Sequence, residues 1–140
     1  MDTKKILVAV DGSEYSNTIL EKAVEYATLL KAGVLLVYCH RKFPAILGQP
    51  YRDHEISHTI SEAEKLIKPF HEYLDGHNIH VEERLMEEPA GRVIPDIARI
   101  EACELIIMGS RGLTNIASLI VGSVTNRVLQ TATCSVLVVR

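Results

Sequence analysis

Apolar residues in this sequence form two patterns, short continuous runs and longer stretches with helical spacing. Almost wholly apolar runs cover residues 5–10, 34–39 and 105–108, and such runs are typical of strands buried on both faces. Residues 79–85 alternate apolar and polar side chains, which predicts a strand with one exposed face at an edge of a sheet. Residues 135–139 predict a last strand at the end of the chain.

Stretches with helical spacing separate these strands. Apolar side chains recur at helical intervals in residues 19–30, 60–74 and 90–101, and again from residue 123 onward. Strand and helix signals therefore alternate along the chain. This order favours an α/β fold with a single doubly wound, mainly parallel five-stranded sheet, helices on both faces and right-handed crossovers, which is a Rossmann-like arrangement. At 140 residues the chain is expected to form one domain over residues 1–140.

Glycine and proline positions predict where the helices end or bend. Gly33 and Gly76 follow the first two helical stretches, as C-terminal glycines do. Residues 40–57 are expected to form a loop, because they contain two prolines and a glycine. Pro69 predicts a kink or a lost hydrogen bond in the second helix, and Pro95 predicts that the third helix bends or starts late.

Composition and charge limit the cellular location and the kinds of binding partner that we expect. Hydrophobic residues make up 47% of the chain, yet no run is long enough to cross a membrane. The net charge of −3 provides no broad basic field for nucleic acid. The three cysteines are scattered, and strand-like sequence begins directly after Met1. We therefore expect a cytoplasmic protein with neither a membrane nor a nucleic acid as its partner.

The segment that follows the apolar run 105–108 carries the clearest chemical signal. Gly109-Ser110-Arg111-Gly112 is followed after nine residues by Gly122-Ser123, at the start of the last helix. Glycine allows a backbone to approach a ligand closely and to adopt positive φ, and a helix N-terminus carries a partial positive charge. Backbone N–H groups at such a place converge on an anion. The segment therefore predicts a phosphate-containing ligand, most simply a nucleotide.

Two further residues are expected at the same crevice, because ligands of doubly wound sheets bind beyond the carboxyl ends of the strands. Asp11 follows the first strand, where its carboxylate could accept hydrogen bonds from ribose hydroxyls. An Asx-turn or a helix cap within Asp-Gly-Ser explains the same residue equally simply. Cys39 ends the second strand, and a cysteine there is more often a small buried apolar group than a reactive one. We expect its backbone, not its thiol, to face a base.

Four segments together resemble the universal stress protein family: KKILVAVDGS at 4–13, MGSRG at 108–112, GSV at 122–124 and VLVVR at 136–140. The Gly-x-x-Gly, nine residues, Gly-Ser spacing is similar to that of the ATP-binding branch. The resemblance implies that the protein binds ATP, with Mg²⁺ or Mn²⁺ held through the phosphates, and signals through its bound state. It also implies a nucleotide site in which backbone around Ala9, Val10 and Cys39 surrounds the adenine, Asp11 lies near the ribose, Met108 and Gly109 line the site, and Gly112, Gly122, Ser123 and Val124 hold the phosphates.

Other functions stay open beside this hypothesis. Arg111 and Arg127 flank the glycine segment, where they either neutralise phosphate charge or are simply solvated. A slow ATPase or another adenine-nucleotide hydrolase is the main alternative, although no general base is evident. The segment from His54 to His58 satisfies the His-Glu-x-x-His pattern of zinc hydrolases, with Glu55 as base. No third ligand stands out downstream, and we interpret this segment as a solvated helix start.

The last strand, 135–139, predicts a homodimer. It is apolar at nearly every position and, as the final element, should lie at one edge of the sheet. An uncovered apolar edge promotes aggregation, so another strand is expected to pair with it. A two-fold axis would place the same strand of a second copy antiparallel to it, and the family resemblance implies the same association.

Overall fold

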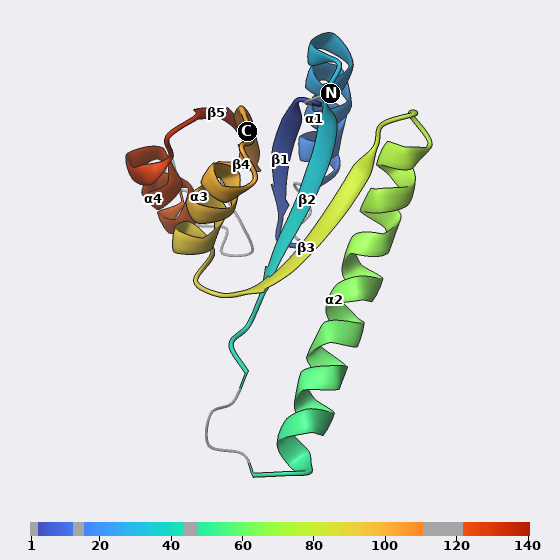
Figure 1. Ribbon diagram of the computed structural model, residues 1–140, viewed down its shortest axis with the longest axis vertical. Coiled ribbons are helices and arrows are strands. Elements are labelled where there is room, and N and C mark those ends of the chain that lie inside the picture. The colour runs from blue at the N-terminus through green and yellow to red at the C-terminus, as the bar shows by residue number, and fades with distance from the viewer. Residues whose placement is uncertain (1–2, 13–15, 44–47, 111–121) are drawn as a thin grey trace.

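Five parallel strands form one sheet in the computed structural model, which describes residues 3–12, 16–43, 48–110 and 122–140 (Figure 1). The strand order is β3-β2-β1-β4-β5, and every neighbouring pair is parallel. The strands are β1 (Lys5–Val10), β2 (Gly33–His40), β3 (Val81–Glu87), β4 (Leu105–Gly109) and β5 (Ser135–Val139). The helices are α1 (Ser16–Leu30), α2 (Tyr51–Asp75), α3 (Ala90–Ile100) and α4 (Ser123–Thr131). The predicted α/β fold is confirmed.

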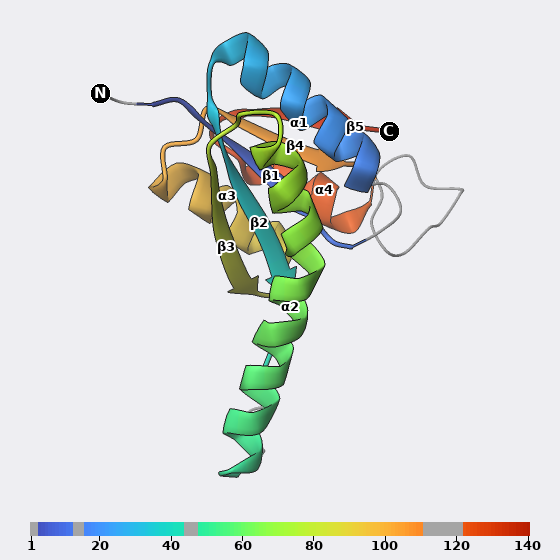
Figure 2. The same ribbon diagram turned by 90° about the vertical axis from the view of Figure 1, so that its right-hand side faces the viewer.

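Alternate side chains of the central strands enter two separate cores. Ile6 and Val8 of β1 pack into the core beneath α1 and α2, whereas Leu7 packs into the core beneath α3 and α4. Figure 2 shows the helices divided between the two faces of the sheet in this way. This arrangement explains the continuous apolar runs, because a strand with helices on both faces has no solvent-facing side. The strands β3 and β5 lie at the edges, as their sequences predicted.

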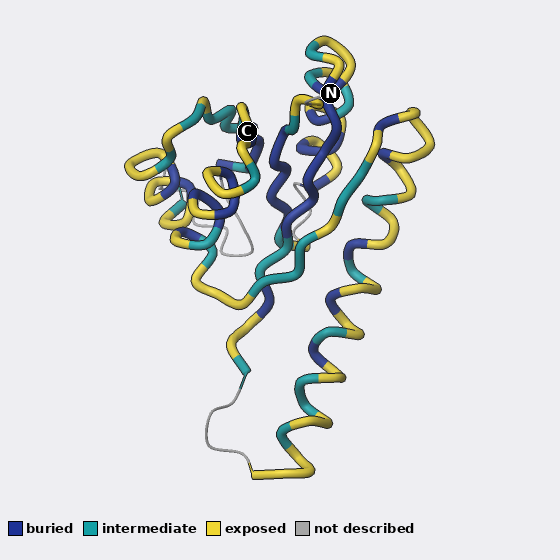
Figure 3. Tube along the Cα trace, in the orientation of Figure 1, coloured by how far each residue is buried: buried dark blue, intermediate teal, exposed yellow. Residues whose placement is uncertain are grey.

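The second helix is longer than its apolar spacing predicted. α2 begins at Tyr51, so the expected loop over residues 40–57 is wrong for its last seven positions. The first turns of α2 extend beyond the end of the sheet (Figures 1 and 3) and present mostly exposed or half-buried residues. A helix that packs on nothing needs no apolar stripe, and so periodicity could not reveal this part.

Prolines lie inside two of the helices without ending them. Pro69 lies within α2 and is exposed, and α2 continues to Asp75. Pro95 is buried in the middle of α3, which nevertheless begins at Ala90, so the expected late start is wrong. Each proline removes one backbone donor. Packing of the surrounding turns against the sheet keeps the helix formed despite that loss.

The left-handed residues at the helix ends are not the two predicted glycines. Gly33 is the first residue of β2, and Gly76 has a helical φ of −62°. The residues in the left-handed conformation are instead Lys31, Asn78 and Ala102, with φ of 54°, 61° and 56°. Each is followed by an N–H group that bonds back to the helix, which is the Schellman arrangement. Gly76 directly follows the last residue of α2, as predicted, whereas Gly33 lies beyond the end of α1, and the left-handed residue is not a glycine in either helix.

Candidate functional site

The direction in which the chain adds strands to the sheet reverses between β1 and β4. The chain runs outward from β1 through β2 to β3, then crosses to β4 on the other side of β1 and continues to β5. In doubly wound sheets the ligand crevice lies at this switch point, beyond the carboxyl ends of the strands. Here the edge is formed by the residues that follow Val10 and Gly109. The sequence-predicted site residues that the structure describes lie at or near this edge.

The end of β1 brings a carboxylate to the crevice. Ala9 and Val10 are buried, whereas Asp11 is half-buried directly after the strand. Gly12 has a φ of +79°, and a Cβ there would lie 2.9 Å from Leu66 Cδ1. The positive φ therefore favours glycine at this position, whereas the side chain of Leu66 could move to make room for a Cβ. Asp11 itself lies at the carboxyl edge, directly after the last residue of β1.

The end of β2 supplies Cys39 in an apolar and acidic surrounding. Burial, followed by the negative charge of Glu88, raises the pKa of the Cys39 thiol to about 11. The thiol is thus protonated near neutral pH and is no nucleophile, since reactivity needs the thiolate. This supports the expectation that any ligand contact at Cys39 involves its backbone.

Tyr38 and Glu88, which lie close to Cys39, were not identified from the sequence. The backbone N–H of Glu88 donates to the carbonyl of His40 over 2.8 Å, which holds Glu88 at the end of β2. Burial raises the pKa of Tyr38, and the carboxylates of Glu88 and Asp11 raise it further. Both residues lie at carboxyl ends of parallel strands, and that rule could have identified Glu88 from its place just after β3.

The end of β4 is joined to the start of α4 by backbone hydrogen bonds. The N–H of Gly122 donates to the carbonyl of Ser110 over 2.7 Å, and the N–H of Ser110 donates to Val139 over 2.8 Å. The hydroxyl of Thr125, buried in the first turn of α4, donates to the carbonyl of Gly109 over 2.7 Å. Met108, just before Gly109, is buried. These bonds place the N-terminus of α4 directly beside the carboxyl end of β4.

The first two residues of α4 are open to solvent. Ser123 and Val124 are exposed, the helix has no side-chain cap, and no acidic residue occurs in its first turn. Gly122 has an extended conformation with a φ of −69°, so it needs no positive φ. The expected role of Gly122 in the phosphate site therefore depends only on its small size, which lets a phosphate approach the backbone closely. The predicted site residues Arg111 and Gly112 lie outside the described residues.

The His-Glu-x-x-His segment lies at the start of α2 and away from this edge. His54 and His58 are exposed on the first turns of the helix, and Glu55 accepts a 2.8 Å hydrogen bond from Arg41. Within the part of the chain that the structure describes, no three His, Cys, Asp or Glu side chains gather as metal ligands. The segment is therefore a solvent-exposed helix start, as interpreted from the sequence, since α2 begins at Tyr51. Among the same described residues, no helix combines the length and hydropathy of a membrane span.

The fold and its edge define a Rossmann-like α/β protein with a ligand crevice at the switch point. The model of the universal stress protein family matches residues 2–140. A universal stress protein of Thermus aquaticus is 32% identical over 139 residues, covering 98% of each chain. The chain belongs to the universal stress protein family.

Solved structures of this family share the fold. The universal stress protein UspA of Lactobacillus plantarum has a TM-score of 0.83 at 21% identity, over 100% of this chain and 99% of its own. An Archaeoglobus fulgidus member in complex with dAMP has a TM-score of 0.65 at 24% identity, over 100% of both chains. An Arabidopsis thaliana member with AMP bound and a universal stress protein in complex with cAMP have TM-scores of 0.65 and 0.73, at 17% and 19% identity.

Proposed function

We propose that this universal stress protein binds ATP at the carboxyl edge of its sheet and that nucleotide occupancy is the state that other molecules recognise. Solved proteins with the same fold carry dAMP, AMP and cAMP, which supports an adenine nucleotide as the ligand class. The proposal of a triphosphate rests on the glycine segment of this sequence and on the start of α4.

The observation that carries the proposal is the N-terminus of α4 beside β4. The 2.7 Å bond from Gly122 to Ser110 aligns the helix start with the crevice, where its unpaired N–H groups attract anions. The carboxylates Asp11 and Glu88 lie instead near the ends of β1 and β2. Phosphates would be repelled by these acids, so the nucleotide is oriented with its ribose toward Asp11 and its phosphates toward Ser123.

A divalent metal would enter with the nucleotide. Mg²⁺ in nucleotide sites is held largely by phosphate oxygens and water, with one or two carboxylates at most. The described part of the chain supplies no cluster of three metal-ligating side chains, and the orientation proposed above puts Asp11 near the ribose. The phosphates therefore provide the principal ligands, and Mg²⁺ or Mn²⁺ serves to neutralise them.

Calorimetric titration with Mg-ATP tests the site. The parent protein should bind, and the variant Gly122→Val should lose affinity by at least about tenfold, because a β-branched side chain would occupy the space that phosphate oxygens approach. Gly48→Val is the matched control, since a Cβ at Gly48 meets nothing within 4 Å. Titration with AMP in parallel measures how much the outer phosphates contribute.

Equal affinities of the Gly122 and Gly48 variants, both still folded by circular dichroism, would contradict the phosphate assignment. Binding of AMP as tight as that of ATP would leave the adenosine end of the site standing and exclude the triphosphate. Phosphate release measured in the same samples should be far below the turnover of about 10 s⁻¹ that is typical of enzymes. Turnover at that level would favour the hydrolase alternative.

We also propose that two copies associate through β5, residues 135–139. The strand is at the edge of the sheet and is paired with β4 on one side only within the described residues. Its side chains are mostly half-buried or buried, and Val136, Leu137 and Val139 contact the two cores. The carboxyl end of β5 reaches Ser110 at the candidate site through the bond to Val139. A nucleotide bound at the candidate site would therefore lie close to the strand through which the two copies are proposed to associate.

A further inference from the structure

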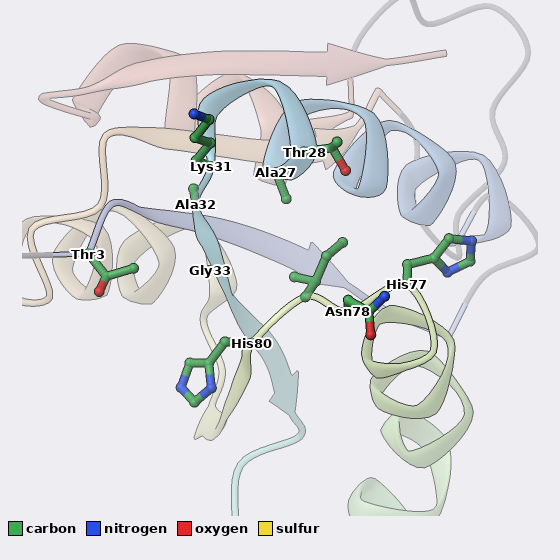
Figure 4. A pocket seen from close by; sticks show the side chains of 10 residues that line it. Thr3, Ala27, Thr28, Lys31, Ala32, Gly33, His77, Asn78 and His80 are labelled. Atoms are coloured by element: carbon green, nitrogen blue, oxygen red, sulfur yellow. The ribbon is translucent and has the colours of Figure 1, made fainter.

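The two ends of α1 lie at opposite edges of the sheet, because α1 crosses back from the carboxyl end of β1 to the amino end of β2. The C-terminal end of α1 borders a pocket of about 360 Å³ at the amino edge, together with the end of α2 (Figure 4). Charges of both signs surround this pocket: Lys31 and His80 line it, whereas the Glu82 carboxylate lies 3.6 Å from His80 Nε2 and helix C-termini carry partial negative charge. The pocket therefore shows no preference for one class of ligand. The N-terminal end of α1 lies at the carboxyl edge, as the candidate nucleotide site does.

Ser16 begins the buried face of α1. The buried residues of this helix follow the three- and four-residue spacing of a single helical face and are Ser16, Ile19, Leu20, Ala23 and Ala27. The apolar members pack into the core beneath α1 and α2, together with Val8 and Val10 of β1. Ser16 therefore faces the sheet as they do, at the end of this core that is nearest the carboxyl edge.

The hydroxyl of Ser16 is buried without a hydrogen-bond partner among the described residues. Ser16 is 2% exposed, and within the same part of the chain its Oγ is the only buried side-chain oxygen or nitrogen that makes no hydrogen bond. A hydroxyl that leaves water without gaining a new bond destabilises the folded protein. Such groups are rare in folded proteins, and one at a ligand crevice points to a partner that comes from outside the chain.

The position of Ser16 in α1 directs its hydroxyl toward the crevice. Side chains of an α-helix lean toward its N-terminus, so the Oγ of the first residue is directed to the open end of the core. The helix contacts β4 as well as β1, and its start therefore lies near the switch point between these two strands. Its first turn contains no acidic residue, and the unpaired N–H groups there carry partial positive charge. The surroundings of the hydroxyl therefore favour an anionic oxygen as its acceptor.

We propose that the Ser16 hydroxyl donates a hydrogen bond to the phosphate that is attached to the ribose of the bound nucleotide. The inference rests on the proposed function, in which the ribose lies toward Asp11 and the outer phosphates lie toward Ser123. A nucleotide that extends from the end of β1 to the start of α4 brings its first phosphate past the switch point, where α1 begins. A hydrogen bond to an anionic oxygen is stronger than one between neutral groups. Ser16 would thus recognise the first phosphate, which AMP and ATP share and adenosine lacks.

Calorimetric titration of the Ser16→Ala variant with AMP and Mg-ATP tests the inference, with adenosine measured by competition against ATP. The affinities for AMP and ATP should both fall about tenfold, because a hydrogen bond to a charged group is lost. The affinity for adenosine should not change. Thr18→Ala is the matched control, since it removes an exposed hydroxyl from the same turn of α1, and it should leave all three affinities unchanged.

Thermal unfolding without nucleotide gives a second, independent test. Ser16→Ala should melt at the temperature of the parent or above it, because the variant removes an unpaired buried hydroxyl. A lower melting temperature would show that the hydroxyl bonds within the chain and would overturn the inference.

The binding results separate this inference from the proposed function. Unchanged AMP and ATP affinities in Ser16→Ala overturn the contact and leave the nucleotide site standing, since the parent still binds. An equal loss of adenosine affinity would place the contact on the nucleoside, and a loss confined to ATP would place it on the outer phosphates; either result overturns the assignment. A parent protein that binds none of the three compounds contradicts the proposed function itself, and this contact with it.

Discussion

Lys31 and Ala102 carry a conformation that L-residues rarely adopt. Both follow a helix, have φ values of 54° and 56°, and close a Schellman arrangement with the next residue. The left-handed region costs a residue with a Cβ about 1–2 kcal/mol. Glycine would avoid that cost, although it loses more backbone entropy on folding. Lys31 and Ala102 are therefore strained positions outside the candidate nucleotide site, whereas the third left-handed residue, Asn78, is of a type that tolerates this conformation.

Replacement of Ala102 by glycine should raise the free energy of unfolding by about 1 kcal/mol. Lys31→Gly should give a smaller gain, because it also removes a cation that interacts favourably with the C-terminal end of α1, worth about 0.3–1 kcal/mol. Urea denaturation followed by circular dichroism measures both. Leu29→Gly, at an exposed helical position, is the control and should lower stability by about 1 kcal/mol. A loss of stability in Ala102→Gly would show that strain at this helix end is negligible.

At the scale of elements, one side-chain hydrogen bond joins the first turn of the short helix α4 to the end of β4, in addition to the backbone bond from Gly122 to Ser110. The hydroxyl of Thr125 is buried and donates to the carbonyl of Gly109 over 2.7 Å. That bond spans the end of the strand and the first turn of the helix, which together form the proposed phosphate site. The position of α4 and the affinity of the site should therefore change together.

Thr125→Val keeps the shape of the side chain and removes the donor. It should lower the free energy of unfolding by about 1–2 kcal/mol, because the half-buried carbonyl of Gly109 loses this donor. Mg-ATP affinity should fall as well. Thr131→Val is the matched control, since the hydroxyl of Thr131 is exposed and bonds only within α4. Equal stability of the two variants would show that the Thr125 bond does not hold the helix in place.

At the scale of the whole molecule, β5 decides whether two copies can form one continuous sheet. The carbonyl of Val139 faces β4, since it accepts from Ser110. Backbone groups alternate in direction along a strand, so those of Val136 and Val138 face away from β4, toward the open edge. Proline at one of these positions removes an outward donor and leaves the ladder with β4 intact.

Val138→Pro should therefore convert the proposed dimer to a monomer, as measured by light scattering across micromolar concentrations. Leu137→Pro is the contrasting variant: its N–H faces β4, and its side chain packs against the core, so it should lower stability as well. A parent protein that is monomeric at high micromolar concentration would contradict the dimer without any variant. A dimer that persists in a folded Val138→Pro variant would place the interface elsewhere.

The pattern of apolar residues alone determined the five strands, their order along the chain and the type of fold. This was possible because the spacing of apolar residues shows whether one or both faces of an element are buried. The sequence also identified Asp11, Gly109 and Gly122 as candidate site residues, since strand ends in a doubly wound sheet converge on one edge. The early start of α2 could not be predicted in this way, because a helical segment that packs on nothing needs no apolar stripe. Local patterns placed the ends of the first two helices only approximately, because Lys31 and Asn78, which are not glycines, take the left-handed conformation there.

Only the tertiary structure decided which residues meet. Glu88 reaches the end of β2 through a backbone bond between neighbouring strands, and Thr125 reaches Gly109 across sixteen positions of sequence. The pocket at the amino edge joins the ends of α1 and α2, which lie far apart along the chain. No periodic pattern in the sequence predicts these contacts, because each depends on how separate elements pack against one another. The sequence determined the elements and the type of fold, and packing determined which side chains share a site.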